Sequence, residues 1–204
     1  MWILIVTNVI VFWWELSEGF DDSIFYLYGE IPALVLRGSR LFTLFTSMFI
    51  HADFLHIIGN MLFLFIFGDN VEDRFGHLSF FLLYFLFGIA GGLSHSIFAV
   101  QAGGTEQLIP TVGASGAISG ILGAYLVFFP RARIMSLVPS FLFIRLARVP
   151  AFIFIGLWFI LQLLYSGGAS SVAYMAHIGG FVAGLVVALP FRTIKKGRQG
   201  VLSR

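Results

Sequence analysis

Two polar residues stand inside segments that are otherwise almost entirely apolar, and their types allow them to act together. Ser115 lies in the sequence Gly-Ala-Ser-Gly-Ala, and His177 lies in the sequence Ala-His-Ile-Gly-Gly. Both segments are apolar enough to cross a membrane, where an ionisable side chain is costly and usually functional. A serine becomes an effective nucleophile when an adjacent histidine accepts its proton. The pair therefore predicts hydrolytic chemistry inside a bilayer. Taken singly, each residue also has a structural explanation, because Ser115 can cap a helix and His177 can be a buried neutral ring.

A second polar pair opens an earlier apolar segment. His56 and Asn60 are four residues apart and therefore share one helix face. Both side chains can donate hydrogen bonds, and donors aimed at one point are what an oxyanion requires. The backbone N–H of Ser115, at the start of a helix, would add a third donor that the helix dipole strengthens. On these residues alone, a polar contact that holds the helix in place is the alternative.

The composition requires a membrane protein of several spans. The 204 residues are 59% hydrophobic and only 11% charged, with a mean hydropathy of +0.97, whereas a soluble domain has about 25% charged residues. Six apolar segments run approximately over residues 1–16, 53–68, 78–100, 113–129, 149–166 and 170–190. We therefore expect an all-α bundle of six transmembrane helices that forms a single domain over residues 1–204. The first segment lacks a signal-peptide pattern and is expected to be a span.

The basic residues orient these six segments. If the C-terminus lies in the cytoplasm, ten of the twelve basic residues fall on that side, within residues 69–77, residues 130–148 and a tail from about 191 to 204. Only Arg37 and Arg40 fall outside. The positive-inside rule then places both termini in the cytoplasm, with Ser115 and His177 near the external face. Five or seven spans would be the alternative.

Small residues indicate which of the predicted helices touch. Gly116, Gly120 and Ala124 recur at intervals of four in the fourth segment, and Gly180 and Gly184 do so in the sixth. Such patterns let transmembrane helices approach closely. If these two stripes meet, Ser115 and His177 come within hydrogen-bond distance of each other. Packing without any chemistry is the alternative.

Other chemistries fit the sequence less well. The absence of cysteine excludes disulfides, thiolate zinc sites and a cysteine nucleophile. No His-Glu-x-x-His motif occurs and the last three segments contain no carboxylate, so we expect no metal and no cofactor. A membrane aspartyl protease needs two intramembrane aspartates, but only Asp69 lies even at a segment end. No basic run with interleaved aromatic residues indicates a nucleic-acid partner.

Four motifs together make the chain resemble the rhomboid family of intramembrane serine proteases over nearly its whole length. They are His-x4-His-x3-Asn at His51, His56 and Asn60; Val71–Gly76; Gly-Ala-Ser-Gly from Gly113 to Gly116; and Ala-His-x-x-Gly from Ala176 to Gly180. The resemblance implies a Ser–His dyad without a third acid, in which Ser115 is the nucleophile and His177 the general base. It also implies an oxyanion hole formed by His56, Asn60 and the Ser115 N–H. Gly113 and the glycines of the two stripes are expected to serve packing.

The resemblance carries further expectations. Residues 17–50 correspond to a partly membrane-embedded L1 loop, while the fifth span and the cap loop before the sixth act as a substrate gate. Transmembrane proteins would be the substrates, membrane lipid the other partner, and the inner membrane of a prokaryotic cell the location. Two positions depart from the family pattern: Ser119 replaces an aromatic residue that packs against the catalytic histidine, and Ser39-Arg40 replaces Trp-Arg. We expect Tyr174 or Tyr125 to hold the ring instead.

These observations favour an intramembrane serine endopeptidase that cleaves transmembrane substrates near their extracytoplasmic boundary through an acyl-enzyme. A catalytically inactive rhomboid-like protein that binds transmembrane clients is the alternative. A small six-span transporter is a third possibility, and the scarcity of intramembrane charge counts against it.

Overall fold

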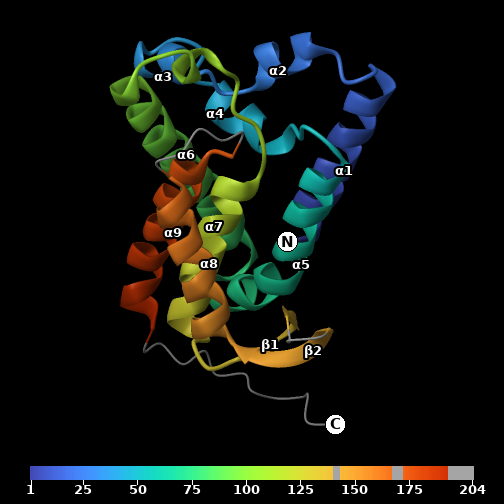
Figure 1. The fold of residues 1–204 in the computed structure, drawn as a ribbon, viewed down its shortest axis with the longest axis vertical. Coiled ribbons are helices and arrows are strands. Elements are labelled where there is room, and N and C mark those ends of the chain that lie inside the picture. The colour runs from blue at the N-terminus through green and yellow to red at the C-terminus, as the bar shows by residue number, and fades with distance from the viewer. Residues whose placement is uncertain (140–142, 167–171, 193–204) are drawn as a thin grey trace.

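The computed structural model describes residues 1–139, 143–166 and 172–192, and helices make up most of this part of the chain (Figure 1). The long helices of these residues are α1 (Trp2–Ser17), α5 (Phe54–Phe75), α6 (His77–Ala102), α7 (Ser115–Phe128), α8 (Ala151–Tyr165) and α9 (Tyr174–Ala188). Three stretches of the described chain are long and apolar enough to cross a membrane: α5, α6, and Tyr174–Phe191, which includes α9 and the 3-10 turn η3 (Leu189–Phe191). The helices α1, α7 and α8 are apolar but shorter, with 16, 14 and 15 residues.

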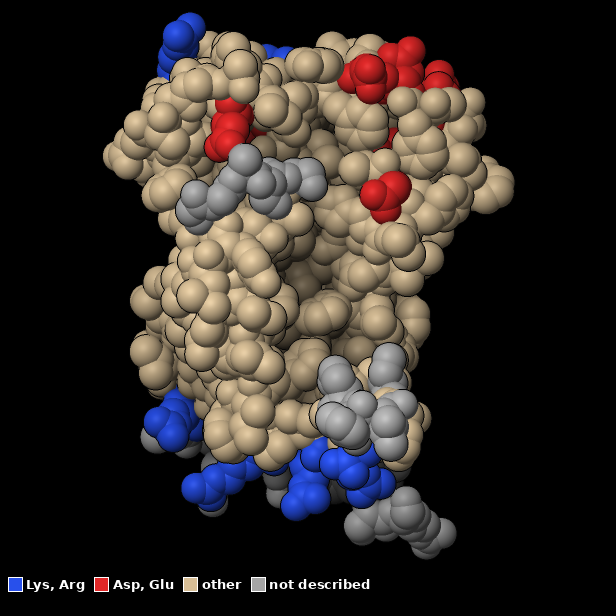
Figure 2. Space-filling view, in the orientation of Figure 1, with Lys and Arg blue, Asp and Glu red and all other residues tan. Residues whose placement is uncertain are grey.

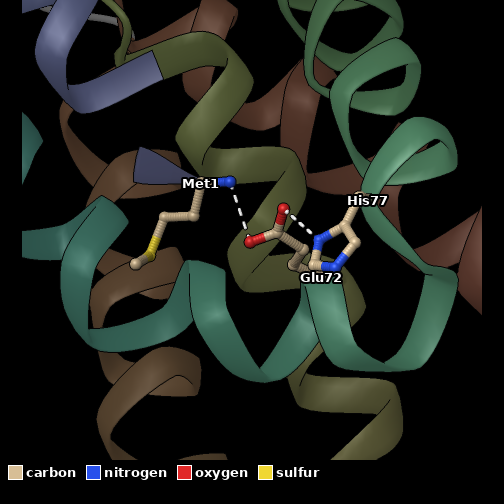
Figure 3. Close-up of polar contacts among 3 residues, drawn as sticks. All are labelled: Met1, Glu72 and His77. Carbon is tan, nitrogen blue, oxygen red and sulfur yellow. Dashed lines mark hydrogen bonds and ion pairs between the residues drawn. The ribbon is translucent and has the colours of Figure 1, made fainter. Parts of the chain in front are cut away.

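The turn between α5 and α6 is shorter than the sequence indicated. Residues 69–77 were expected to connect two spans, but α5 continues through Phe75 and only Gly76 separates the helices. Hydropathy reports where the apolar residues end, whereas a helix can continue into polar surroundings with its own hydrogen bonds intact. Glu72 lies in this extension. One of its carboxylate oxygens is 2.8 Å from the backbone nitrogen of Met1 and the other is 3.0 Å from His77 Nδ1 (Figure 3), so the beginning of α1 is joined to the turn.

Residues 17–50 form a chain of short helices at the end of the molecule opposite the hairpin described below (Figure 1). These elements are α2 (Asp22–Tyr28), α3 (Pro32–Leu36), α4 (Thr43–Thr46) and the 3-10 turn η1 (Ser47–Phe49). Asp21 caps α2, because its carboxylate accepts a 2.7 Å hydrogen bond from the backbone N–H of Ser23. Hydrogen bonds from the Ser23 side chain and then from its backbone N–H hold the pKa of Asp21 below its ordinary value.

A buried carboxyl group anchors this segment to α6. The side chain of Glu30 is 3% exposed, and it accepts a 2.6 Å hydrogen bond from the hydroxyl of Ser96. Gly92 leaves the space that the carboxyl group occupies, since a methyl group there would overlap Glu30. Two backbone bonds of 2.9 and 2.7 Å pair Glu30 with Thr111, beyond the 3-10 turn η2 (Glu106–Leu108). The short helices are thus fixed both to α6 and to the loop that leads into α7.

A two-stranded hairpin connects α7 to α8, although the fold was expected to be all-α. Strand β1 (Arg133–Pro139) pairs with β2 (Ile144–Pro150) in antiparallel register, with Ile134 opposite Val149. Side chains of β1 alternate between buried and exposed, which is the period of a strand. From the sequence, these residues were expected only to form a basic connection. Backbone bonds from Ala151 and Phe152 to Ala132 and Pro130 fix the beginning of α8 beside the hairpin.

The two ends of the molecule differ in charge. Most of the visible Lys and Arg side chains lie at the hairpin end, whereas the visible Asp and Glu side chains and a few basic ones lie toward the opposite end (Figure 2). The described part of the hairpin end includes Arg131, Arg133, Arg145 and Arg148. Most of the basic tail predicted over residues 191–204 lies outside the described residues.

Helix α7 occupies the centre of the bundle, and glycines bring α9 close to it. All residues from Gly116 to Tyr125 are buried. A methyl group added to Gly180 would overlap the carbonyl oxygen of Gly116, and one added to Gly184 would overlap that of Gly120. The two helix backbones therefore touch where side chains are absent. This is the close approach that small residues allow between membrane helices.

Replacing Gly184 should test this contact. We expect Gly184→Ala to lower the free energy of unfolding by about 3 kcal/mol, because the new methyl group must displace a backbone carbonyl. Gly156→Ala in α8 is the matched control, since its added methyl group has nothing within 4 Å apart from the adjoining backbone of its own helix. The control should be neutral or stabilising by up to about 1 kcal/mol. Equal unfolding midpoints for the two variants in detergent would contradict close packing at Gly184.

The buried carboxyl group predicts a pH dependence of stability. Burial raises the pKa of Glu30 from 4.5 to about 7, so the folded protein holds this proton more tightly than the unfolded chain does. Its contribution to stability should be fully present below pH 4.5 and lost as the pH rises through 7, by roughly 3 kcal/mol. Glu30→Gln cannot titrate and should flatten this part of the curve. Unfolding measured from pH 4.5 to 8 checks this, and identical curves for both proteins would contradict it.

Candidate active site

Ser115 and His177 meet where α7 and α9 begin. Ser115 is the first residue of α7, and His177 lies in the first turn of α9. The glycine contact holds these helix ends together, and His177 Nε2 lies 2.7 Å from Ser115 Oγ. Both side chains are partly buried. A hydroxyl group and an imidazole nitrogen at this distance form the nucleophile and base pair that serine chemistry requires.

The other nitrogen of His177 contacts a residue that the sequence analysis missed. Gln162, on α8, is buried and its Oε1 lies 2.7 Å from His177 Nδ1. Its Nε2 lies 3.2 Å from the backbone oxygen of Trp158 on the same helix. A signal for it existed, because Gln162 is the only amide or charged side chain between Ala151 and Tyr165. A lone polar residue in an apolar span usually bonds across to another helix.

Other aromatic residues pack around the His177 ring, since position 119 is a serine where the family pattern has an aromatic residue. The Trp158 ring centroid is 6.0 Å from that of His177, with 34° between the planes. The Tyr174 ring is 6.4 Å away and perpendicular, so one of the two expected tyrosines contacts the ring. Tyr125 packs instead against Phe67, with 5.0 Å between ring centroids. The Ser119 hydroxyl donates to the Ser115 carbonyl at 2.6 Å, within its own helix.

The first turns of α5 present two hydrogen-bond donors. Asp53 caps the helix, since its carboxylate accepts a 2.8 Å bond from the His56 backbone N–H. His56 Nδ1 accepts from the Ala52 N–H at 3.4 Å, which leaves the proton of a neutral ring on Nε2. Asn60 Nδ2 uses one hydrogen to bond the His56 carbonyl at 3.1 Å and keeps the other. His56 Nε2 and Asn60 Nδ2 can therefore both donate to a bound group.

A cavity joins these donors to the Ser115–His177 pair. It has a volume of about 230 Å³ and is bordered by α5, α7, α8 and α9, with His56, Asn60, Ser115 and His177 in its wall. Gly113 keeps the space beside His56 open, because its φ of +118° suits glycine and a methyl group would lie 2.6 Å from His56 Nε2. The rest of the wall is mostly apolar, and it includes Phe63, Ile118, Leu122 and Trp158.

The first histidine of the motif in this region has a different environment. His51 is fully buried, its Nδ1 donates to the Phe49 carbonyl at 3.2 Å, and its backbone N–H donates to the Glu15 carboxylate at 3.1 Å. Burial lowers the pKa of His51 to about 3, so the ring is neutral. These bonds tie α1 to the entry of α5. Among the described residues, no group of three or more potential ligand side chains could hold a metal ion.

Comparison with known proteins identifies the family. Residues 38–193 match the family model described as "Rhomboid domain", which covers well over half of the chain. The chain belongs to the rhomboid family. This membership confirms the resemblance inferred from the four sequence motifs.

Relatives of this rhomboid come from distant organisms. It is 31% identical over 214 aligned positions to "RHOMBOID-like protein 12, mitochondrial" of Arabidopsis thaliana, covering 96% of this chain and 58% of that protein. It is 29% identical over 173 positions to "Rhomboid protease GluP" of Bacillus subtilis (strain 168), covering 85% and 30% respectively. It is 28% identical over 174 positions to "Rhomboid-like protease 3" of Toxoplasma gondii, covering 84% and 60%. The chain thus spans less than two thirds of the length of these relatives.

Proposed function

We propose that this rhomboid is an intramembrane serine endopeptidase that cleaves transmembrane substrates near their extracytoplasmic boundary. The observation that carries the proposal is the 2.7 Å contact between Ser115 Oγ and His177 Nε2. Its position on a cavity wall beside two further donors supports the same reaction. Proteases occur among the relatives of this rhomboid, as the names of two of them state.

His177 acts first as a base and then as an acid, because it accepts the Ser115 proton and later passes it to the leaving group. Ser115 Oγ attacks the scissile carbonyl carbon while His177 Nε2 accepts the hydroxyl proton. Collapse of the tetrahedral intermediate breaks the C–N bond, and His177 gives the proton to the leaving amine. The resulting ester between the substrate and Ser115 is the acyl-enzyme. A water molecule, deprotonated by His177, then attacks the ester carbon and releases Ser115.

The donors on α5 stabilise the negative oxygen of the tetrahedral intermediate. His56 Nε2–H and the free Asn60 amide hydrogen approach from one side of the cavity. The N–H of Ser115 approaches from the helix end, where it has no carbonyl one turn earlier to bond. The positive end of the α7 dipole adds to this field. Gly113 leaves room for the oxygen near His56.

The length of α7 supports a reaction below the membrane surface. Its 14 residues extend about 21 Å, whereas the hydrocarbon core of a bilayer is about 30 Å thick. A helix of this length that reaches one face begins several ångströms inside the other. We place Ser115 at that submerged end, on the external side, because the arginine-rich hairpin marks the cytoplasmic end. Water and substrate then reach Ser115 through the cavity.

The charge difference between the two ends also orients the whole molecule in the membrane. All six long helices span, both termini lie in the cytoplasm, and residues 1–204 act as one domain in contact with lipid. The inner membrane of a prokaryotic cell is the proposed location. A substrate enters between α5 and α8, which both border the cavity, and α8 together with the cap loop before α9 acts as the gate. Residues 167–171 of that loop lie outside the described residues.

Removing either member of the dyad tests the reaction. Ser115→Ala and His177→Ala should each lower cleavage of a transmembrane substrate by roughly three orders of magnitude or more, since each depends on the other. Cleavage by purified protein and labelling with a fluorophosphonate probe measure this. Ser17→Ala and His77→Ala, which change exposed residues, are matched controls and should keep full activity. Equal cleavage by the wild type and Ser115→Ala would overturn the proposal and favour a rhomboid that only binds clients.

The oxyanion donors can be tested separately. His56→Ala and Asn60→Ala should each lower kcat about tenfold or more, because each removes one donor to the developing charge. Asn70→Ala is the matched control, since it removes an exposed amide from the same helix. Full activity in both variants would assign His56 and Asn60 to helix packing alone.

A further inference from the structure

A directed series of hydrogen bonds runs from α8 through His177 to Ser115. Gln162 lies between the backbone of its own helix and the His177 ring, with contacts of 3.2 Å to the Trp158 oxygen and 2.7 Å to His177 Nδ1. The next contact is the 2.7 Å bond between His177 Nε2 and Ser115 Oγ. Three side chains from three helices thus form one continuous path.

The backbone end of this path fixes the direction of every bond. A carbonyl oxygen can only accept, so the Trp158 oxygen must face the amide nitrogen of Gln162. Gln162 Oε1 then faces His177 and can also only accept. His177 Nδ1 must therefore carry the proton, which leaves a lone pair on Nε2. That lone pair is what the Ser115 hydroxyl needs in order to donate toward His177.

We propose that Gln162 is a positioning residue that holds His177 in the tautomer required to activate Ser115. The inference rests on the proposed serine endopeptidase function and adds the residue that orients its base. In soluble serine proteases a buried aspartate bonds to the corresponding nitrogen. Here a neutral amide does so in an apolar helix bundle, where a carboxylate without a cationic partner would be costly.

The surroundings of Gln162 suit this role. Trp158 is one helical turn away on the same face of α8, and its ring lies beside the His177 ring. The helix is otherwise weakly embedded, since only Ala151, Ile155 and Gln162 are buried. Gln162 is therefore the one polar anchor between the outer part of α8 and α9 among the described residues. An outward movement of α8 releases His177 Nδ1, so the position of this helix controls whether the base is oriented.

The tautomer can be measured without any substrate. Nitrogen-15 spectra of histidine-labelled full-length protein in detergent, with His177→Ala used to assign the signal, should show the proton on Nδ1 in the wild type. Gln162→Leu should give a mixture of both tautomers, because leucine fills a similar volume but accepts no hydrogen bond. A wild-type His177 with its proton on Nε2 would overturn the inference even if every variant failed to fold.

The activity test compares three variants by the rate of fluorophosphonate labelling of Ser115. Gln162→Leu should lower the rate about tenfold or more. Gln162→Glu should stay within about threefold of the wild type, because a carboxyl oxygen accepts from Nδ1 in either charge state. Gln101→Leu, which changes an exposed glutamine on α6, should match the wild type. Thermal unfolding of each variant separates lost orientation from lost folding.

The outcomes are distinguishable. Equal labelling of the wild type and Gln162→Leu would overturn the positioning role, as would equal losses in the Leu and Glu variants with unchanged unfolding temperatures. An unlabelled wild type would remove the proposed protease function, while the nitrogen-15 spectra would still decide whether Gln162 fixes the tautomer.

Discussion

The contact between the backbones of α7 and α9 is the constraint on which the candidate site depends. Lipid supplies no hydrophobic force between helices, so close association requires backbone atoms to touch. Gly180 and Gly184 make this possible by lying directly against the carbonyl groups of Gly116 and Gly120. Ser115 lies one residue before Gly116, and His177 lies three residues before Gly180. A separation set by glycine backbones thus favours the 2.7 Å contact between Ser115 Oγ and His177 Nε2.

Buried polar residues secure the less regular parts of the molecule around this contact. Each one bonds to an element distant in the sequence: Glu15 to the entry of α5, Glu30 to α6, and Gln162 to α9. In an apolar environment an unpaired polar group is costly, so each bond strongly favours one arrangement of its elements. The short helices of residues 17–50 also bury apolar side chains such as Val35, Leu44 and Met48, and the bonds of Glu30 add a defined position to this packing.

Helix packing that repeats along the sequence could be predicted. Contacts between one residue and a single distant partner could not. The glycine intervals and the apolar segments indicated which helices pack, because both signals repeat along the chain. The extension of α5 to Phe75 carries no such signal, since its hydrogen bonds are helical while its side chains are polar. The hairpin was missed because its strands are short and contain arginines. Gln162 was visible as a lone amide, but only the folded chain brings it to His177.

The attachment of α8 differs between its two ends. At the hairpin, backbone bonds from Ala151 and Phe152 join the helix directly to residues that precede β1. At the other end, the side chain of Gln162 is the anchor, and most of the helix surface between them is exposed. Ring contacts of Trp158 with His177 and of Phe159 with Phe181 add to this anchor, but no backbone bond joins this part of α8 to α9 among the described residues. With its backbone fixed at Ala151, α8 would pivot there, and its displacement would be greatest at the end that carries Gln162, beside the candidate site.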